Sequence, residues 1–386
     1  MDKDELIICL TGGSTGGHLF PLIFVTREMR KIMAAKNISI RFIYIGCRPV
    51  DANIFLKEGI EVYFIPSFKL RRYFSLSNLI DILKMPLSFL LAFYYLFKFL
   101  PNVIFSKGGP GSLAVVIMGW FLRLPIFIHD SDTIPGLTNK ISSLFAKKIF
   151  ISFPEAAEHL FHKKRTVLVG HPVNVETIVR PVLTEDYEKF KLNPEKKIIF
   201  VLGGSQGSKF LNDLILEILP SLLSLAQVVH QVGSQNFNEV KLQLAGLATI
   251  TQEKKQININ DYHLFSFISN DDTLRLLKMA DLVISRAGAG SIFELAATGT
   301  PSILIPIEEA VAGKHQLLNA QKYYLAGACI MFEEKNAKPH VLLTEIVNIL
   351  SNKELADKMR EKAKAFAKLD AGFKIATELI DEILKQ

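Results

Sequence analysis

Three glycine-rich turns stand where short aliphatic runs give way to helix-length segments, and each of them could bind an anion. They read GGSTGG at 12–17, GGSQGS at 203–208 and AGAGS at 287–291. Such a turn gathers backbone N–H groups and the positive end of the following helix at one point. Any one of them could be a tight turn that merely needs glycine. Three in one chain favour binding of a phosphate-bearing substrate.

His18 is the most informative single residue, because it follows Gly16 and Gly17 where the first helix should begin. We expect its ring to project toward a cleft between two domains, with the positive helix end helping to keep it neutral near pH 7. A neutral imidazole can accept a proton, so His18 is a candidate general base. A capping or packing histidine is the alternative.

The third turn leads into a helix that we expect to begin at about Ser291, with Glu294 in its first turn. A carboxylate there can accept hydrogen bonds from a ribose diol while the helix N-terminus receives a diphosphate. A glutamate that merely suits the helix dipole is the alternative. Farther along, His315, Gln316 and Asn319 could share one helix face and suit a sugar.

Other motifs would imply other chemistries. GGSTG and GGSQG both match the G-x-S-x-G nucleophile elbow of hydrolases. Ser14, however, follows the first strand, which is too early in the chain for the hydrolase fold, and a duplicated elbow would need two catalytic triads. GPGSLA at 109–114 matches a dinucleotide fingerprint, yet it follows the fourth strand, which argues against a dehydrogenase. Asp130 and Asp132 form a D-x-D pair. Two carboxylates alone hold Mg²⁺ poorly, so we expect no metal.

Alternating strands and helices must position these residues. We expect strands at 6–11, 39–45, 62–65, 102–105, 125–129, 148–152, 197–202, 228–232, 262–265, 282–285 and 302–306. Strands that alternate with helices form parallel, doubly wound sheets. The segments LIICLTGGSTGG and KIIFVLGGSQGS superpose, so both halves follow one plan. The predicted fold is α/β, with two Rossmann-like doubly wound parallel-sheet domains facing a central cleft.

The length of 386 residues favours two domains. We place an N-terminal domain at 1–170 and a C-terminal domain at 171–370, with a hinge in the proline-rich and charged segment 169–196. Apolar residues at helical spacing in 371–386 predict an amphipathic helix that completes the N-terminal domain.

The net charge of +7 is unevenly distributed, because six cations face one acid between residues 66 and 107. Six aromatic residues also fall within 89–99. This segment is too apolar for a nucleic-acid groove, and an anionic membrane surface fits it better. A buried core helix behind a basic loop is the alternative. The apolar stretches are shorter than the ~20 residues of a spanning helix, and the acidic start predicts no secretory signal.

Read together, the motifs resemble a known family. GGSTGGHLFP, PGLTNK at 135–140, GHPV at 170–173, GGSQGS, AGAGSIFE and HQLLNA at 315–320 occur in the order found in the MurG family of bacterial glycosyltransferases (GT-B fold, glycosyltransferase family 28). The resemblance implies inverting transfer of N-acetylglucosamine (GlcNAc) from UDP-GlcNAc to the 4-hydroxyl of N-acetylmuramic acid in the undecaprenyl-linked lipid I, which forms lipid II of peptidoglycan.

The resemblance also implies how the protein works in the cell. It implies a peripheral enzyme on the cytoplasmic face of the bacterial membrane, with no cofactor and no metal. UDP-GlcNAc, lipid I and the anionic membrane surface are the implied partners, together with complexes of cell-wall synthesis and division. A UDP-sugar transferase acting on another membrane lipid and a catalytically silent UDP-GlcNAc-binding subunit are the alternatives.

By motif position, the resemblance makes His18 the candidate base and assigns two further groups of residues. The donor-binding group is Thr15, Gly16, Gly17, Ser205, Gln206, Ile268, Ala289, Gly290, Ser291, Ile292, Phe293, Glu294, Gln316 and Asn319. The second group lies on the acceptor side or has no assigned substrate, and it comprises Ser14, Gly108, Gly109, Asp132, Asn139, Asn174 and His315. The chain departs from the family pattern at Pro110, Asp132 and Asn174, where the family commonly has an aromatic residue, Asn and Arg.

Overall fold

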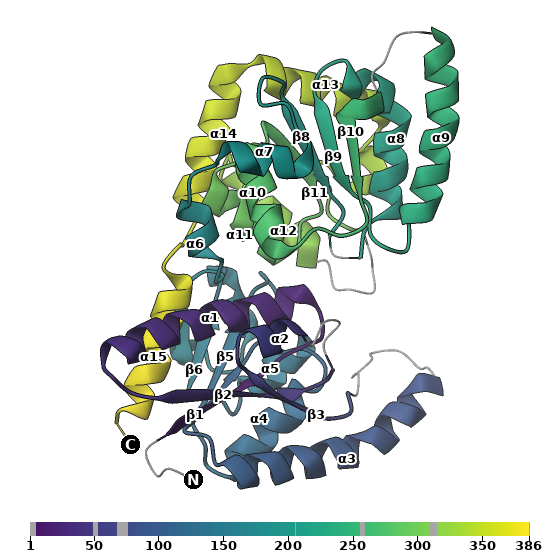
Figure 1. Ribbon diagram of the computed structural model, residues 1–386. Helices are drawn as coiled ribbons and strands as arrows, with labels where there is room; N and C mark the ends of the chain where they lie inside the picture. Colours follow the sequence, from purple (N-terminus) through teal and green to yellow (C-terminus); the bar gives the residue numbers. More distant parts are fainter. Residues whose placement is uncertain are drawn as a thin grey trace. The chain divides into compact units, whose positions relative to one another are not determined.

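A computed structural model describes residues 5–48, 53–67, 76–204, 206–254, 259–308 and 315–385 (Figure 1). The chain divides into two compact units. The N-terminal unit comprises Met1–Val173 and Lys368–Gln386, and the C-terminal unit comprises Asn174–Ala367.

The N-terminal unit is built on a seven-stranded sheet in the order β3-β2-β1-β4-β5-β6-β7, with all neighbouring strands parallel. The strands are β1 (Leu6–Thr11), β2 (Ile40–Gly46), β3 (Glu61–Phe64), β4 (Val103–Ser106), β5 (Ile126–Asp130), β6 (Lys148–Ile151) and β7 (Thr166–Leu168). The strand order reverses between β1 and β4. Ligands bind at this position in doubly wound sheets, because the loops after these strands diverge there.

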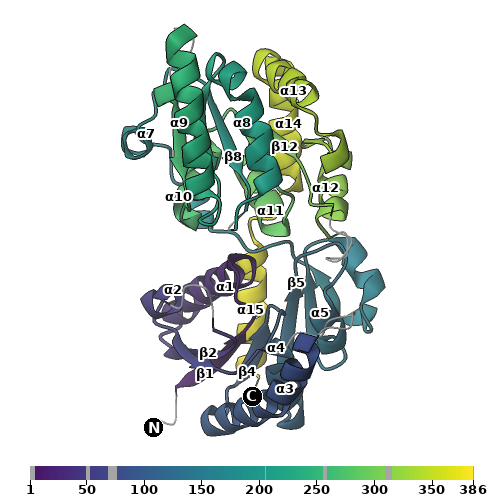
Figure 2. The ribbon, with the colours of Figure 1, turned by 90° about the vertical axis from the view of Figure 1, so that its right-hand side faces the viewer.

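Helices cover both faces of this sheet. They are α1 (Gly16–Ala35), α2 (Asn53–Lys57), α3 (Leu76–Phe99), α4 (Ser112–Phe121), α5 (Leu137–Ser142) and α15 (Ala371–Ile383), with 3₁₀ turns at Pro154–His159 and Lys163–Arg165. α1 and α15 share one core with β1, while α3 and α4 share a second core (Figure 2). Ile375, Leu379 and Ile380 of α15 are buried in the first core, so the expected C-terminal amphipathic helix has α1 as its partner.

The C-terminal unit repeats the plan with a six-stranded sheet in the order β10-β9-β8-β11-β12-β13, again parallel throughout. Its strands are β8 (Ile198–Leu202), β9 (Gln227–Gln231), β10 (Tyr262–Phe265), β11 (Leu282–Ser285), β12 (Ser302–Leu304) and β13 (Ile330–Met331). Its helices are α6 (Val175–Val179), α7 (Thr184–Phe190), α8 (Lys209–Leu223), α9 (Phe237–Lys254), α10 (Asn270–Met279), α11 (Ala289–Thr298), α12 (His315–Leu325), α13 (Pro339–Ser351) and α14 (Lys353–Phe366), with 3₁₀ turns at Ile259–Asp261 and Glu334–Asn336.

Two doubly wound parallel α/β sheets confirm the predicted fold class, and all eleven expected strands form within a few residues of their expected bounds. The sequence reading missed β7 and β13, which are edge strands of three and two residues and too short to carry a periodic signal. The segment 169–196 that was expected as a hinge contains α6 and α7.

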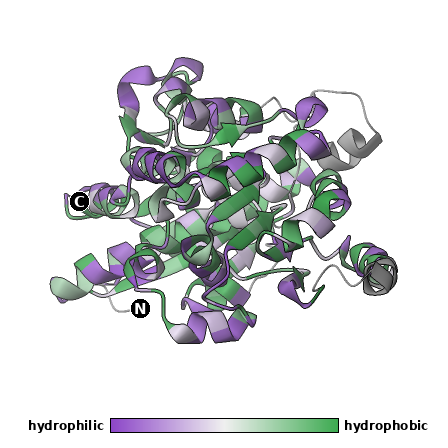
Figure 3. Ribbon diagram, turned by 90° about the horizontal axis from the view of Figure 1, so that it is seen from above, coloured by the Kyte–Doolittle hydropathy of each residue, from purple (hydrophilic) through white to green (hydrophobic). Residues whose placement is uncertain are grey.

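Buried aliphatic strands explain the high apolar content, and the central strands are largely hydrophobic in colour in Figure 3. Within the described part of the chain, every helix is too short or too polar to cross a bilayer.

Candidate active site

His18 lies in the first turn of α1, at the carboxyl edge of the N-terminal sheet. Its Nδ1 is 3.0 Å from Oγ1 of Thr15, the residue that precedes the helix. Partial burial, reinforced by the positive charge of Lys107 and opposed by Asp132, lowers the pKa of His18 to about 4. The ring is therefore neutral at pH 7, as expected, but burial and Lys107 are the main causes rather than the helix end.

Glycines allow the chain to pass close to this ring. A Cβ on Gly13 would lie 2.9 Å from Nδ1 of His18, and one on Gly109 would lie 2.7 Å from Cα of Gly13. Gly108 and Gly109 also have φ values of 78° and 90°, which residues with side chains rarely adopt. The loops after β1 and β4 can meet beside His18 only because these positions carry no side chain.

A cluster of buried polar groups lies beneath these loops. Lys107 follows β4 and is 3% exposed, and its Nζ donates to Oγ of Ser131. Ser131 Oγ lies 2.8 Å from Nδ1 of His171. Asn139 donates through Nδ2 to Oδ2 of Asp130 at 2.7 Å. Charge and hydrogen bonding therefore tie together the residues that follow β4, β5 and β7.

Burial and mutual charge shift the pKa values within this cluster. Burial lowers the pKa of Lys107 to about 8, while the carboxylates of Asp130 and Asp132 oppose that shift. Burial and the charge of Asp132 raise the pKa of Asp130. The pKa of His171 lies well below its usual value because of burial and the nearby Lys107. Clustered, perturbed titratable groups of this kind are typical of functional sites.

Expected acceptor-side residues occupy different surroundings. Asp132 lies beside His18, and Asn139 lies against Gly108, where an added Cβ would clash with its Oδ1. Ser14 hydrogen-bonds the Cys47 thiol of the neighbouring loop. Asn174 belongs to the C-terminal unit, where it caps α6 and donates to Oδ1 of Asp271 at 2.7 Å.

The glycine turn after β8 is braced by a glutamine at the end of β9. Gln231 donates through Nε2 to the carbonyl of Gly204 at 2.9 Å, and its Oε1 accepts from the N–H of Ile268 at 2.8 Å. Gln206 is exposed on this turn. Ser205, one of the expected donor-binding residues, lies outside the described residues.

Arg286 joins the turns that follow the central strands of the C-terminal sheet. This residue is 6% exposed and follows β11 directly. Its guanidinium donates to Oγ of Ser208 and to the carbonyl of Ile305, and it pairs with Glu334 at 2.6 Å. It also lies over the ring of Phe210. One side chain therefore positions the start of α8 against the loop after β12.

Glu294 differs from the expectation for its place in the helix. Because α11 begins at Ala289 rather than near Ser291, Glu294 lies in the second turn and not the first. Its Oε1 accepts from Nδ2 of Asn270 at 2.8 Å. Burial raises the pKa of Glu294 to about 7, so this carboxyl group holds its proton to a much higher pH than an exposed glutamate does. The remaining motif residues Gly290, Ile292 and Phe293 form the body of the same helix.

Gln316 and Asn319 lie on α12, which begins at His315. Gln316 Oε1 is 3.3 Å from the backbone nitrogens of Ala287 and Ile307, so this side chain joins the loops after β11 and β12. Asn319 is fully buried, and Nδ1 of His315 is buried without a hydrogen-bond partner among the described residues. All three residues lie within the first five positions of α12.

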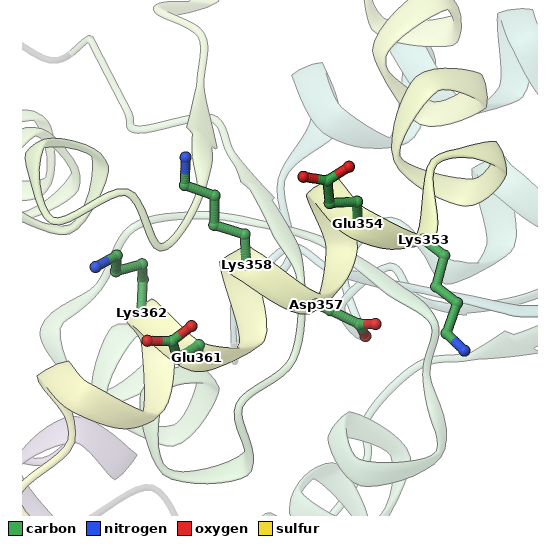
Figure 4. Close-up of a pocket in the computed structure, with 6 residues that line it drawn as sticks. All are labelled: Lys353, Glu354, Asp357, Lys358, Glu361 and Lys362. Atoms are coloured by element: carbon green, nitrogen blue, oxygen red, sulfur yellow. The ribbon is translucent and has the colours of Figure 1, made fainter.

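One hollow on the surface is lined by none of these residues. Its lining comes from α14 alone and consists of Lys353, Glu354, Asp357, Lys358, Glu361 and Lys362 (Figure 4). All six side chains are exposed and carry charges of both signs, which is typical of a solvated helix face. Among the described residues, no group of three His, Cys, Asp or Glu side chains is arranged to hold a metal ion.

Sequence reasoning missed Lys107, His171, Asn270 and Arg286 as members of these sites. Lys107 belongs to the basic segment 66–107 and His171 to the GHPV motif, and neither pattern indicates a buried cluster. A lysine directly after an aliphatic strand is a usable signal, because a parallel sheet brings such positions to one edge. Asn270 gave no sequence signal, since its contact with Glu294 joins residues 24 positions apart.

Comparison with known proteins gives the family. The family model "Glycosyltransferase family 28 N-terminal domain" matches residues 8–151, and "Glycosyltransferase family 28 C-terminal domain" matches residues 198–372. The chain is 35% identical over 353 residues to a Bacillus cereus "UDP-N-acetylglucosamine--N-acetylmuramyl-(pentapeptide) pyrophosphoryl-undecaprenol N-acetylglucosamine transferase 2", covering 90% of this chain and 92% of the relative. It is 32% identical over 379 residues to the corresponding Clostridium botulinum transferase, covering 98% and 99%.

Solved structures share the fold. The crystal structure of Acinetobacter baumannii MurG matches with a TM-score of 0.70 at 22% identity, covering 97% of this chain and 99% of that one. UDP-GlcNAc 2-epimerase from Neisseria meningitidis, solved with UDP-GlcNAc bound, matches with a TM-score of 0.68 at 12% identity, covering 99% and 100%. The two parallel sheets, the glycine turns and the near full-length relatives all indicate the same family. The chain belongs to glycosyltransferase family 28, in the MurG family of N-acetylglucosamine transferases.

Proposed function

We propose that this protein transfers GlcNAc from UDP-GlcNAc to the 4-hydroxyl of N-acetylmuramic acid in lipid I and so forms lipid II. The observation that carries the proposal is the identity of 32–35% over nearly the full length to transferases of this name. The site geometry supports it. The neutral imidazole of His18 lies at the carboxyl edge of the N-terminal sheet, and in the C-terminal unit the same helix, α11, supplies an N-terminus and the carboxyl group of Glu294.

The acceptor oxygen attacks the anomeric carbon of GlcNAc, the bond from that carbon to the diphosphate breaks, and UDP leaves with the bonding electrons. His18 takes the proton of the attacking hydroxyl, and its contact with Thr15 fixes the orientation of the ring. Direct attack of this kind inverts the anomeric centre. A diphosphate bound nearby would raise the pKa of His18 from about 4 toward neutrality, which makes the imidazole a stronger base.

In the C-terminal unit, the N-terminus of α11 at Ala289 receives the diphosphate of the donor, because N–H groups of a helix start converge there. Glu294 accepts hydrogen bonds from the ribose hydroxyls. Because the N–H of Ile268 already donates to Gln231, the uracil donates a hydrogen bond to the carbonyl of Ile268. Gln316 holds the GlcNAc hydroxyls through its amide nitrogen while its oxygen faces two backbone N–H groups.

Membrane association is supported by an exposed apolar patch on α3 and α4. Its members, which we call the α3–α4 patch, are Leu87, Leu90, Tyr94, Phe97, Trp120 and Phe121. The opposite side of α3 is buried through Ala92 and Leu96, so the core-helix alternative describes that side, and the membrane interpretation concerns the exposed side alone. Exposed Lys84, Lys98 and Arg123 add positive charge beside the patch, as an anionic lipid surface requires. Of the other expected cations, those at 69–72 lie outside the described residues, whereas Lys107 is 3% exposed and does not add to the surface charge.

The decisive experiment is transfer of radiolabelled GlcNAc from UDP-GlcNAc to a short-chain lipid I analogue. We expect product with this acceptor and none with diacylglycerol. Product with diacylglycerol and none with the lipid I analogue would mean that the natural acceptor is another membrane lipid. Binding of UDP-GlcNAc without product from either acceptor would identify a silent binding subunit instead.

A further inference from the structure

Lys107 is a buried lysine at the carboxyl edge of the N-terminal sheet. Its backbone N–H donates to the carbonyl of Thr11 at 2.9 Å, which fixes it beside the end of β1. Lys107 is 3% exposed, and a buried ammonium group is strongly unfavourable unless carboxylates and hydrogen-bond acceptors surround it. What surrounds Lys107 therefore indicates what it does.

We propose that Lys107 is a positioning residue of the transfer reaction, which fixes the chain after β5 through Ser131 and offsets the charge of Asp132 beside His18. The proposal rests on the proposed function, in which His18 is the general base.

The hydrogen bonds carry the first half of this proposal. Lys107 donates to Oγ of Ser131, and the same oxygen lies 2.8 Å from Nδ1 of His171. The backbone N–H of Asp132 donates to Oδ1 of Asp130 at 3.0 Å. Ser131 stands between these two aspartates in the chain, so anchoring Ser131 limits where the carboxylate of Asp132 can lie.

The charges carry the second half. The titratable and charged groups that face Lys107 or His18 from the surrounding elements are Asp130, Asp132, His129 and His171. Lys107 lowers the pKa of His18, whereas Asp132 raises it. The two opposite charges act on the same ring, so each should be visible in the titration of His18 when the other is removed.

The test is an NMR titration of the His18 ring in four proteins, with His18→Gln used to assign the signal. We expect Lys107→Gln, which keeps a hydrogen-bond donor without the charge, to raise the titration midpoint by about one pH unit. Asp132→Asn should leave His18 neutral down to pH 4 or below. The double variant should return close to the wild-type midpoint, because both charges are gone.

Transfer activity gives a second readout. At saturating UDP-GlcNAc, where the bound ribose already holds Glu294 ionised, the acid limb of kcat/KM for the acceptor reports the ionisation of His18, so Lys107→Gln should move this limb to higher pH. A lower rate with an unchanged pH profile and an unchanged midpoint would mean that Lys107 supports the fold only, and would overturn the proposal.

Removal of Lys107 leaves buried carboxylates without a counter-charge, so Lys107→Gln can fail to fold. In that case Asp132→Asn is compared with the double variant, which differs from it by the same lysine charge; equal midpoints would overturn the proposal. Absence of lipid I glycosylation by the wild-type protein would overturn the proposed function and this role together. Normal glycosylation with a midpoint insensitive to Lys107 would overturn the role of Lys107 alone.

Discussion

Burial shifts the pKa values of two residues in this protein in opposite directions. Burial lowers the pKa of His18 to about 4 and raises that of Glu294 to about 7, because burial disfavours the charged form in both cases. The imidazole is thereby kept ready to accept a proton, while the carboxyl group is only partly ionised near neutrality. Substrate binding should change both states.

His18→Ala should lower the rate of the transfer step by ~10²–10⁴-fold, the usual contribution of a general base. The affinity for UDP should stay within about twofold of wild type, since the donor contacts lie on other residues. Single-turnover transfer and calorimetric UDP titration measure the two effects. Thr15→Val, which removes the contact to Nδ1 but leaves the imidazole in place, is the comparison variant, and we expect a loss of about tenfold. A normal rate for His18→Ala would remove this residue from the mechanism.

Glu294 should release a proton when UDP binds near pH 7. Ribose hydroxyls that donate to the carboxylate favour its charged form, so binding lowers a pKa that starts at about 7. UDP affinity should therefore rise as the pH increases from 6 to 8. Calorimetry in buffers with different ionisation enthalpies detects the released proton, and Glu294→Gln should abolish the release and weaken UDP binding by at least about tenfold. Equal proton release by both proteins would refute the ribose contact.

At the scale of elements, α3 and α15 show how one helix can serve two environments. α3 buries Ala92, Leu96 and Phe99 against the sheet while Leu90 and Phe97 remain 67% and 62% exposed. α15 buries one face against α1 and leaves Phe373 52% exposed. In both helices one face packs against the unit and the other faces solvent, so each face can be altered without the other.

Leu90→Ser combined with Phe97→Ser should reduce binding to anionic vesicles without changing the melting temperature. The part of binding that survives high salt should fall most, because apolar insertion is insensitive to ionic screening. Co-sedimentation with phosphatidylglycerol vesicles measures binding. Leu242→Ser on α9 is the matched control, since Leu242 is 74% exposed but lies in the C-terminal unit. Unchanged sedimentation of the double variant would exclude the α3–α4 patch as a membrane surface.

Leu379→Ala on α15 should lower the free energy of unfolding by about 2–5 kcal/mol, because this side chain is fully buried in the core shared with α1. Phe373→Ala on the exposed face of the same helix should change it by less than about 0.5 kcal/mol. Urea unfolding followed by circular dichroism compares the two variants. Equal effects would mean that α15 is not part of the N-terminal core.

At the scale of the whole molecule, two units divide the chemistry between them. The candidate base and the α3–α4 patch belong to the N-terminal unit, and the expected donor residues from Gln206 onward belong to the C-terminal unit. In the proposed mechanism, the N-terminus of α11 and polar side chains bind the donor diphosphate. Transfer should therefore proceed at an unchanged rate in EDTA, because these groups stabilise the departing diphosphate without a cation. Loss of activity in EDTA that Mg²⁺ restores would assign Asp130 and Asp132 to a metal.

The sequence by itself determined the fold class and the family, because these depend on local patterns. Aliphatic runs at strand length and glycine turns at strand ends are read directly from neighbouring residues. The edge strands β7 and β13 escaped this reading because two or three residues carry no period. The start of α11 was misplaced by two residues because alanine and glycine can stand either in a turn or in the first turn of a helix.

Only the tertiary structure decided which residues surround His18 and Glu294. Lys107, Ser131 and His171 come from three separate strand ends, and a parallel sheet brings them to one edge. The pKa values follow from that assembly, since burial and charge depend on residues far apart in the chain. The sequence likewise did not determine which face of α3 is exposed, because both faces are apolar. Packing against α4 and the sheet decides which face is buried.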